Sequence, residues 1–374
     1  MLHPETKLLR LPAAPHRRIL VTGDIHGHPD HLKEVLTRAD FSGDDFLIIL
    51  GDIIEKGPDS LGTLREVMAL CANGNAIALI GNVDAYRLRI LDEMNEENAE
   101  NLYPYLLQLR DWQGSSFYDE LAHECGYSIS CPDDILRANA DILTHFAPEL
   151  TFLASRPTAL AMGNFVFVHG GLPERDFDAN ADRDVFALTK YDRFAQSTPH
   201  VFEQYIVVGH WPVSLYNDEI QQLNPIINRE KHIISIDGGC GIKREGQLNL
   251  LILPHAECTP DEITSLSYDT LPRIRALQAQ TAGENSVHIC WLTNEIQLLS
   301  RGAEFSRIYH PHSGRTLEVP SIYLIGDSRC RDYSDYMLSV AVGDALSLIC
   351  ETSRGCIVKK DGVIGWYCGN YEKR

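Results

Sequence analysis

Five short apolar segments of this chain each end in Asp, Asn or His, the residue types that bind divalent metal ions. They are followed by Asp24 and His26 (after residues 18–23), Asp52 (after 46–51), Asn82 (after 76–81), His169 (after 164–168) and His210 (after 205–209). Carboxylate, amide and imidazole groups together suit Mn²⁺, Fe and Zn²⁺. Because layered α/β sheets place their sites at the carboxyl ends of strands, we expect these six side chains to converge.

A centre of this composition predicts hydrolysis at phosphorus by two cations about 4 Å apart. Asp24 and His26 are expected to hold the first cation and Asp52 to bridge, while Asn82, His169 and His210 complete the second site. A metal-bound hydroxide would then attack the phosphorus in line, as both cations stabilise the phosphoryl oxygens.

Each member alone has an ordinary structural interpretation. An Asp or Asn after a strand is commonly a turn residue or a helix N-cap, and a lone His is usually structural. Gly326-Asp327 and Gly343-Asp344 repeat the Gly-Asp pair with no His following, so both are expected to be turns. The joint occurrence of five such segments in chain order favours the metal centre.

Composition restricts the partners. The 374 residues include 33 Lys and Arg against 52 Asp and Glu, a net charge of −19, which argues against binding to nucleic-acid backbones. Ten cysteines without a CxxC pair or a signal peptide indicate reduced thiols in the cytoplasm. The apolar runs are strand-length, so no membrane span is expected.

The pattern predicts two regions. Residues 1–254 alternate buried strands with helices near 30–38, 59–71 and 84–94, which is typical of an α/β layered fold. Residues 95–155 interrupt them as a helical insertion, either with its own small core or as a cap that shapes substrate access. Residues 255–374 read as an all-β region of brief strands.

The motifs of residues 17–253 resemble the calcineurin-like metallophosphoesterases. The similarity is strongest to the phosphoprotein phosphatase branch, which includes bacterial diadenosine-tetraphosphate hydrolases. It is carried by residues 23–27 (GDIHG), 51–57 (GDIIEKG), 81–84 (GNVD), 169–172 (HGGL), 207–213 (VVGHWPV) and 235–240 (SIDGGC). Pro212 stands where other branches carry a further His. The resemblance implies a β-sandwich flanked by helices and two divalent metal ions, with Mn²⁺ expected and Fe or Zn²⁺ as alternatives.

The second motif departs from the family pattern. The family has Asp-Arg, and its Arg binds the substrate phosphate, whereas this chain has Glu55 and Lys56. Lysine offers a point charge in place of a bidentate fork, so phosphate binding should be less directional. Arg193, in an aromatic-Asp-Arg segment similar to that of bacterial members, is the second phosphate-binding candidate. Its alternative is an ordinary solvated surface arginine.

The third motif also departs, because Val83 stands where the family has the His that protonates the leaving oxygen. Loss of a general acid typically costs about 10²–10⁴-fold in rate. The loss is greatest for basic alkoxide leaving groups, so we expect a bias toward aryl phosphates, nucleotides or dinucleoside polyphosphates. His28 and Asp84 are the candidates to replace this acid, and together with Asp52 they form the predicted catalytic set. Alternatively, His28 is a plain surface residue.

The last part of the chain, from about residue 300 to 374, resembles an SH3-like barrel. Asp361-Gly362 between two strand-like runs is a strong hairpin signal. Cys368-Gly369 stands where SH3 domains carry a groove proline, which disfavours polyproline recognition. Docking on the catalytic domain, self-association or another protein partner is expected instead.

These features predict a metal-dependent phosphatase, most similar to phosphoprotein phosphatases, that acts on a phosphorylated protein or a nucleotide. One alternative is a dinucleoside polyphosphate hydrolase or phosphodiesterase. Another, of a different class, is a regulatory protein that keeps the metals, has lost effective turnover and acts through its SH3-like module.

Overall fold

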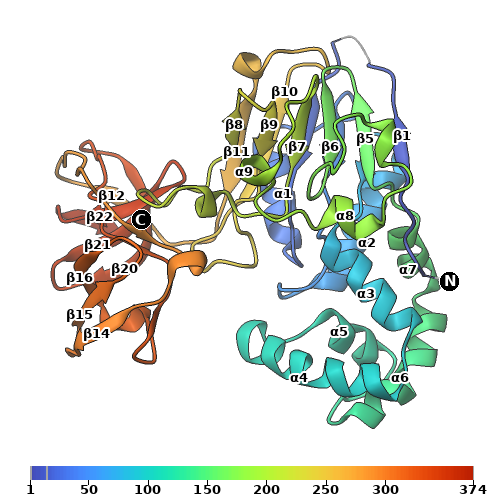
Figure 1. Cartoon of the computed structure of the whole chain (residues 1–374), viewed down its shortest axis with the longest axis horizontal. Coiled ribbons are helices and arrows are strands. Elements are labelled where there is room, and N and C mark those ends of the chain that lie inside the picture. Colours follow the sequence, from blue (N-terminus) through green and yellow to red (C-terminus); the bar gives the residue numbers. More distant parts are fainter. Residues whose placement is uncertain (1, 14–15, 374) are drawn as a thin grey trace. The chain divides into compact units, whose positions relative to one another are not determined.

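The computed structural model describes residues 2–13 and 16–373, and the chain forms two compact units (Figure 1). The first comprises Met1–Trp211 and Pro225–Tyr268, and the second comprises Pro212–Asn224 and Asp269–Arg374. Strand β11 (Thr264–Tyr268) belongs to the first unit because it pairs antiparallel with β10 (Leu248–Leu253). The boundary predicted after residue 254 therefore falls in the connection between two paired strands, and the division follows Tyr268 instead.

Two sheets form the centre of the first unit. One has six strands in the order β1-β5-β6-β7-β9-β8, and the other has five in the order β11-β10-β2-β3-β4. The remaining bounds are β1 (Leu8–Arg10), β2 (Ile19–Thr22), β3 (Phe46–Ile49), β4 (Ala76–Ala78), β5 (Ala159–Met162), β6 (Phe165–Val168), β7 (Tyr205–Val208), β8 (Ile226–Asn228) and β9 (Ile233–Ser235). Strands β2, β3 and β4 are mutually parallel, as are β6, β7 and β9.

Alternation along the strands explains the layers. In β2, Ile19 and Val21 join a buried cluster formed between the two sheets, whereas Leu20 points to a second cluster shared with the helices. Successive side chains of a strand face opposite sides, so a strand with apolar residues at every position is buried on both faces. The predicted α/β layered fold is confirmed.

Helices cover the five-stranded sheet and form the insertion. Their bounds are α1 (Pro29–Arg38), α2 (Ser60–Ala72), α3 (Asn82–Asp92), α4 (Glu96–Gln113), α5 (Phe117–Glu124), α6 (Pro132–His145), α7 (Ala147–Ala154), α8 (Val185–Thr189) and α9 (Phe194–Ser197), with 3₁₀ turns at Asp178–Asn180 and Pro260–Glu262. The three helices predicted near 30–38, 59–71 and 84–94 are α1, α2 and α3. Helices α4–α7 occupy the predicted insertion (Figure 1). No helix of the described residues is both long and apolar enough to cross a membrane.

The second unit is built from strands and 3₁₀ turns throughout its described residues. Its elements are β12 (Arg273–Ala276), β13 (His288–Ile289), β14 (Gln297–Ser300), β15 (Phe305–His310), β16 (Arg315–Pro320), β17 (Leu324–Ile325), β18 (Arg329–Cys330), β19 (Tyr333–Ser334), β20 (Ala345–Thr352), β21 (Gly355–Lys360), β22 (Val363–Tyr367) and β23 (Tyr371–Lys373), with 3₁₀ turns at Val213–Tyr216, Trp291–Thr293 and Ser321–Tyr323.

Its main sheet runs β22-β21-β20-β12-β23. Strand β12 lies between β20 and β23, so the sheet includes residues outside the predicted range 300–374. The predicted hairpin is present, because Lys360 pairs with Val363 and the turn residues Asp361 and Gly362 have φ of 47° and 73°. Gly326 and Gly343 also lie in turns, with φ of 63° and 93°. The SH3-like assignment stays a prediction.

Candidate metal centre

The predicted ligands lie where parallel strands of the two sheets end. Asp24 and His26 follow β2, Asp52 follows β3, and Asn82 opens α3 after β4. In the other sheet His169 follows β6 directly and His210 follows β7. Because parallel neighbours end at the same edge of a sheet, these short loops bring side chains from distant parts of the sequence together.

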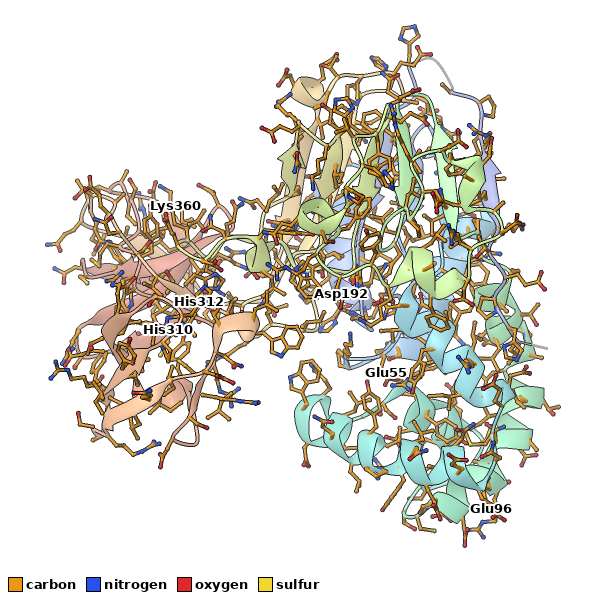
Figure 2. The ribbon with its side chains drawn as sticks, viewed as in Figure 1. Glu55, Glu96, Asp192, His310, His312 and Lys360 are labelled. Carbon is orange, nitrogen blue, oxygen red and sulfur yellow. The ribbon has the colours of Figure 1, made fainter. Side chains whose placement is uncertain are left out.

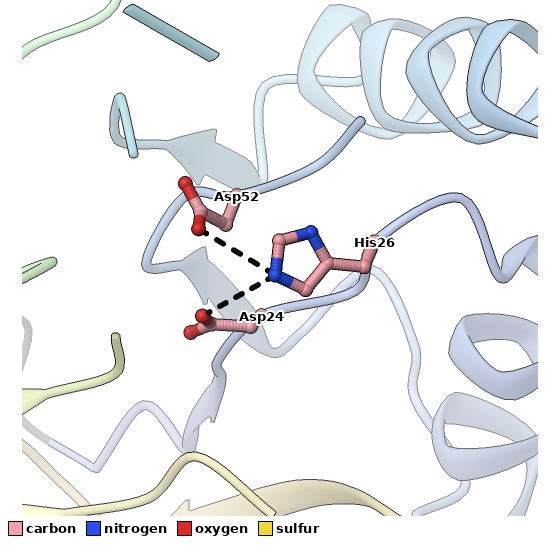
Figure 3. Close-up of side chains that lie close together, drawn as sticks. All are labelled: Asp24, His26 and Asp52. Atoms are coloured by element: carbon pink, nitrogen blue, oxygen red, sulfur yellow. Dashed lines mark ion pairs between the residues drawn. The ribbon is translucent and has the colours of Figure 1, made fainter. Parts of the chain in front are cut away.

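Asp24, His26 and Asp52 form the centre of the cluster (Figure 3). The Nε2 atom of His26 lies 3.8 Å from Asp24 Oδ2 and 3.5 Å from Asp52 Oδ2. None of the three residues is more than 2% exposed, and one ligand atom from each lies within 4.8 Å of the others. This group can hold a metal ion.

His169 connects this group to Asn82. Its Nε2 atom lies 3.0 Å from Asn82 Oδ1 and 3.4 Å from Asp52 Oδ1, and its Nδ1 atom lies 4.0 Å from Asp24 Oδ1. Five of the six predicted ligands therefore meet through their side chains.

His210 joins the cluster differently. Its backbone N–H donates to Asp24 Oδ1 at 2.9 Å, and its ring centroid lies 5.4 Å from that of His169. Its Nε2 atom lies 2.7 Å from Asp192 Oδ1, a residue that the sequence motifs did not single out. A metal ion would therefore compete with Asp192 for the Nε2 atom of His210.

The hydrogen bonds leave the metal-binding atoms available. The Nδ1 atom of His26 lies 3.1 Å from the carbonyl of Ile54, and that of His169 lies 3.2 Å from the carbonyl of Leu50. A carbonyl only accepts, so each Nδ1 carries a proton that it donates, which leaves Nε2 to act as a ligand. Asp24 Oδ2 is buried and has no hydrogen-bond partner among the described residues. The donor set therefore fits divalent cations.

The backbone is strained at three of these residues. His26, Asp52 and His210 have φ of 48°, 49° and 63°, in the left-handed region that costs a non-glycine residue roughly 1 kcal/mol. Close packing maintains the turns: a Cβ on Gly81 would lie 2.1 Å from the backbone nitrogen of Asp52, so only glycine fits there. Such strain is typical of functional sites.

Burial and mutual charge shift the titration of the cluster. Burial, and then the charge of Lys56, lower the pKa of His26 to about 3, so this imidazole is neutral at pH 7. Burial raises the pKa of Asp24, and the charge of Asp237 raises it further. Burial alone would lower the pKa of His169, but the charges of Asp52 and Asp24 raise it to about 9. Without cations, a protonated His169 balances the carboxylates.

The metal-free protein should accordingly lose stability as the pH rises from 6.5 to 9. His169 binds its proton more tightly in the folded protein, where its pKa is about 9, than in the unfolded chain with the ordinary value of 6.5. Its contribution is complete below pH 6.5 and is lost as the pH passes 9, on the order of 2–3 kcal/mol of unfolding free energy.

Urea unfolding in EDTA across this pH range would measure that loss. With saturating Mn²⁺ the trend should vanish or reverse, because a metal requires the neutral imidazole. A metal-free protein whose stability stays level from pH 6.5 to 9 would show that His169 does not carry this charge.

Of the two predicted phosphate-binding residues, the structure brings one into the cluster. The Nζ atom of Lys56 lies 3.3 Å from His26 Nε2. Arg193 is exposed at the start of α9, and its Nε atom donates to Gln196 Oε1 at 3.1 Å. The phosphate-binding role of both residues stays a prediction.

The two candidate proton donors are occupied by the backbone. His28 Nδ1 lies 2.6 Å from the carbonyl of His26, and burial lowers the pKa of His28. Both carboxylate oxygens of Asp84 are used: Oδ1 accepts from the Ile53 and Ile54 N–H groups at 3.0 and 3.3 Å, and Oδ2 accepts from Gly81 N–H at 3.0 Å. Burial, and then the charge of Asp52, raise the pKa of Asp84 to about 7. Asp84 therefore connects the turn that carries Asp52 to the turn that carries Asn82 through these hydrogen bonds.

Glu55 ties the insertion to these turns. It lies between the sheets and the helices of the insertion (Figure 2) and is fully buried. Its Oε2 atom pairs with the Arg87 guanidinium, and its Oε1 atom accepts from Phe117 N–H at 3.1 Å. Glu120 of α5 accepts from the Leu61 N–H at 2.7 Å, at the start of α2. The insertion is thus attached to the loop that carries Asp52 and Lys56.

Two acidic residues near the centre, Asp192 and Asp237, lie in motifs named above but had no predicted role in the site. The only feature of the sequence that drew attention to the position of Asp192 was its neighbour Arg193, the second phosphate-binding candidate. Asp237 follows the buried strand β9 and precedes two glycines, the same strand-then-Asp pattern as Asp24 and Asp52. That pattern could have identified it.

Comparison with known proteins agrees with the motifs. The family model described as calcineurin-like phosphoesterase matches residues 17–230. A symmetrical bis(5'-nucleosyl)-tetraphosphatase of Ralstonia nicotianae is 30% identical over 151 residues, 40% of this chain and 40% of that protein. The Aeromonas hydrophila protein of the same name is 41% identical over 71 residues, 19% of this chain and 25% of that protein. The matches thus span well under two thirds of these relatives.

A solved serine/threonine phosphatase of Saccharomyces cerevisiae aligns with 72% of this chain and 85% of its own, at 14% identity and a TM-score of 0.44. The family match covers more than half of the chain and includes all five strand ends at which metal ligands were predicted. This chain therefore belongs to the calcineurin-like phosphoesterases.

Proposed function

We propose that this protein is a metal-dependent phosphatase that hydrolyses phosphate esters or anhydrides of a phosphorylated protein or a nucleotide. The observation that supports this function is the buried group of Asp24, His26 and Asp52, with His169 beside it. Two divalent cations, Mn²⁺ with Fe or Zn²⁺ as alternatives, would supply Lewis acidity at the phosphoryl oxygens when bound there.

The chain's own residues would orient the substrate. Asp52 faces His26 with Oδ2 and His169 with Oδ1, as a bridging carboxylate requires. The Lys56 ammonium beside His26 would bind a phosphoryl oxygen as a point charge, with Arg193 as a second candidate. His28 and Asp84 remain the candidate proton donors.

A second candidate function is hydrolysis of dinucleoside polyphosphates. Two observations favour it: the Val83 side chain cannot act as a general acid, and the curated relatives are named bis(5'-nucleosyl)-tetraphosphatases. An anhydride releases a weakly basic phosphate, which needs little protonation.

A substrate panel with Mn²⁺ distinguishes these functions. We expect kcat/KM for p-nitrophenyl phosphate, a phosphotyrosine peptide and diadenosine tetraphosphate to exceed that for a phosphoserine peptide at least tenfold. Equal values across leaving groups of different basicity would contradict the proposed preference. No turnover of any substrate would favour the regulatory alternative.

Restoring the missing acid should change this preference. The Val83→His variant is expected to raise kcat/KM for the phosphoserine peptide about 10- to 100-fold, part of the effect of a positioned general acid. Activity on p-nitrophenyl phosphate should rise less than threefold, because its leaving group is weakly basic.

Val83→Ala is the matched control, since it also removes the valine side chain but adds no acid. A gain that is equal for both substrates, or that appears equally in Val83→Ala, would show that the imidazole does not protonate the leaving group.

We further propose that the second unit contacts a protein partner through its SH3-like strands or mediates self-association. The Trp of the Gly-Trp strand, Trp366, is 7% exposed and donates to the Tyr333 hydroxyl at 3.3 Å, so it cannot line a polyproline groove. A pocket of about 440 Å³ lies elsewhere in this unit, lined in part by Trp291, Pro311 and Arg329.

A cytoplasmic location accords with ten cysteines that form no disulfide.

A further inference from the structure

Asp237 is a buried carboxylate beside the metal centre, and it lies in the 235–240 motif without having been assigned a role in the predicted site. It follows β9, whose residue Ser235 pairs with Val208 of the parallel strand β7. Asp237 therefore leaves its strand at the level at which His210 leaves the neighbouring one. The residue is 1% exposed.

The turn that carries Asp237 packs directly on the turn that carries Asp24. A Cβ on Gly23 would lie 3.4 Å from Ile236 Cγ1 and 3.9 Å from Asp237 Cα, so the turn after β9 lies in van der Waals range of Gly23, the residue before Asp24. Burial raises the pKa of Asp24 most, and the negative charge of Asp237 raises it further. The two carboxylates are thus close neighbours in a buried environment.

The two carboxylate oxygens of Asp237 differ in their hydrogen bonding. Oδ1 accepts from Gly239 N–H at 2.7 Å, which stabilises the turn after β9. Oδ2 is buried and has no hydrogen-bond partner among the described residues. A buried carboxylate oxygen without a partner is costly, and a bound cation is one of the few groups that can compensate it. Stabilising the turn would need only Oδ1, which an asparagine could supply equally well.

We propose that Asp237 is a further carboxylate of the metal centre, and that its Oδ2 joins Asp24 in binding the cations held there. This inference rests on the proposed function, because it assumes that the centre holds divalent cations. A third carboxylate strengthens the preference for hard cations, since carboxylates suit Mn²⁺ and Mg²⁺, whereas imidazole suits Zn²⁺.

Titration of Mn²⁺ into the full-length, metal-free protein tests the inference, with free Mn²⁺ followed by its EPR signal. The Asp237→Asn variant is expected to bind Mn²⁺ at least tenfold more weakly, while Asn Oδ1 still accepts from Gly239. Its metal-free form should melt at the same temperature as the wild type or higher, because a buried charge has been removed. A purely structural carboxylate would instead lower the melting temperature and leave Mn²⁺ affinity unchanged.

Asp59→Asn is the matched control, because Asp59 caps α2 through Gly62 N–H at 2.7 Å and asparagine caps equally well. Equal Mn²⁺ affinity of the wild type and Asp237→Asn overturns this inference alone. A wild-type protein that binds no Mn²⁺, Fe or Zn²⁺ overturns the proposed function, and this inference with it. Should Asp237→Asn fail to fold, Asp237→Glu keeps the charge. If that variant also unfolds, Asp237 is structural and the inference is wrong.

Discussion

Replacing Asp52 with asparagine is expected to lower kcat/KM for p-nitrophenyl phosphate about 10³-fold in the presence of Mn²⁺, roughly 4 kcal/mol of activation free energy. Asparagine keeps the shape of the side chain and can still accept from Val83 N–H, which is 2.8 Å from Asp52 Oδ1. It removes the negative charge that faces both His26 and His169. The expected loss of kcat/KM therefore measures how much the negative charge of the bridging carboxylate contributes to activity.

Steady-state kinetics of the wild type, Asp52→Asn and Asp59→Asn would measure the effect. Asp59→Asn should keep activity within twofold, because its N-cap contact is preserved. The Mn²⁺-induced rise in melting temperature should shrink in Asp52→Asn alone. If Asp52→Asn and the wild type turn over equally slowly while both bind Mn²⁺, the chain is the regulatory protein of the alternative hypothesis.

Replacing Arg87 with methionine should lower the unfolding free energy of the first unit by about 3–5 kcal/mol. The Arg87 side chain is 6% exposed and pairs with Glu55, which is fully buried. Its guanidinium carbon also lies 4.5 Å from the centroid of the Tyr105 ring in the insertion. Removing the cation leaves a carboxylate buried without its counter-charge, which is the costly way to break an ion pair.

Urea unfolding with hydrogen exchange of the insertion would measure this loss. The Glu55→Gln/Arg87→Met double variant should recover at least 1 kcal/mol, because the uncompensated charge is gone. Arg89→Met is the control, since Arg89 is 53% exposed, pairs with Glu93 on the surface and should cost below about 1 kcal/mol. Equal losses in Arg87→Met and Arg89→Met would contradict a stabilising role for the buried pair.

Much of the fold could be predicted because its signals are local. Strands such as β3 are continuous apolar runs, Asp59 caps α2, and Asp361-Gly362 requires a tight hairpin turn. The strand-then-ligand pattern also indicated all six candidate metal residues, since leaving a strand at its carboxyl end is a property of short sequence segments.

The domain division could not be predicted in the same way. Strand β11 lies beyond an apparent change in sequence character, yet it pairs with β10, and β12 completes a sheet whose other strands begin 69 or more positions later. Pairing between strands depends on long-range register, which local composition does not encode.

The sequence by itself determined which residue types end each strand and hence the kind of chemistry available to this chain. Tertiary structure decided which of them meet. It turned the His210 Nε2 atom toward Asp192, engaged both oxygens of Asp84 with backbone N–H groups, and placed Asp237 against the turn that carries Asp24. The physical reason is that hydrogen-bond partners and buried charge are properties of three-dimensional neighbours, and residues 24 and 237 become neighbours only when the two sheets pack face to face.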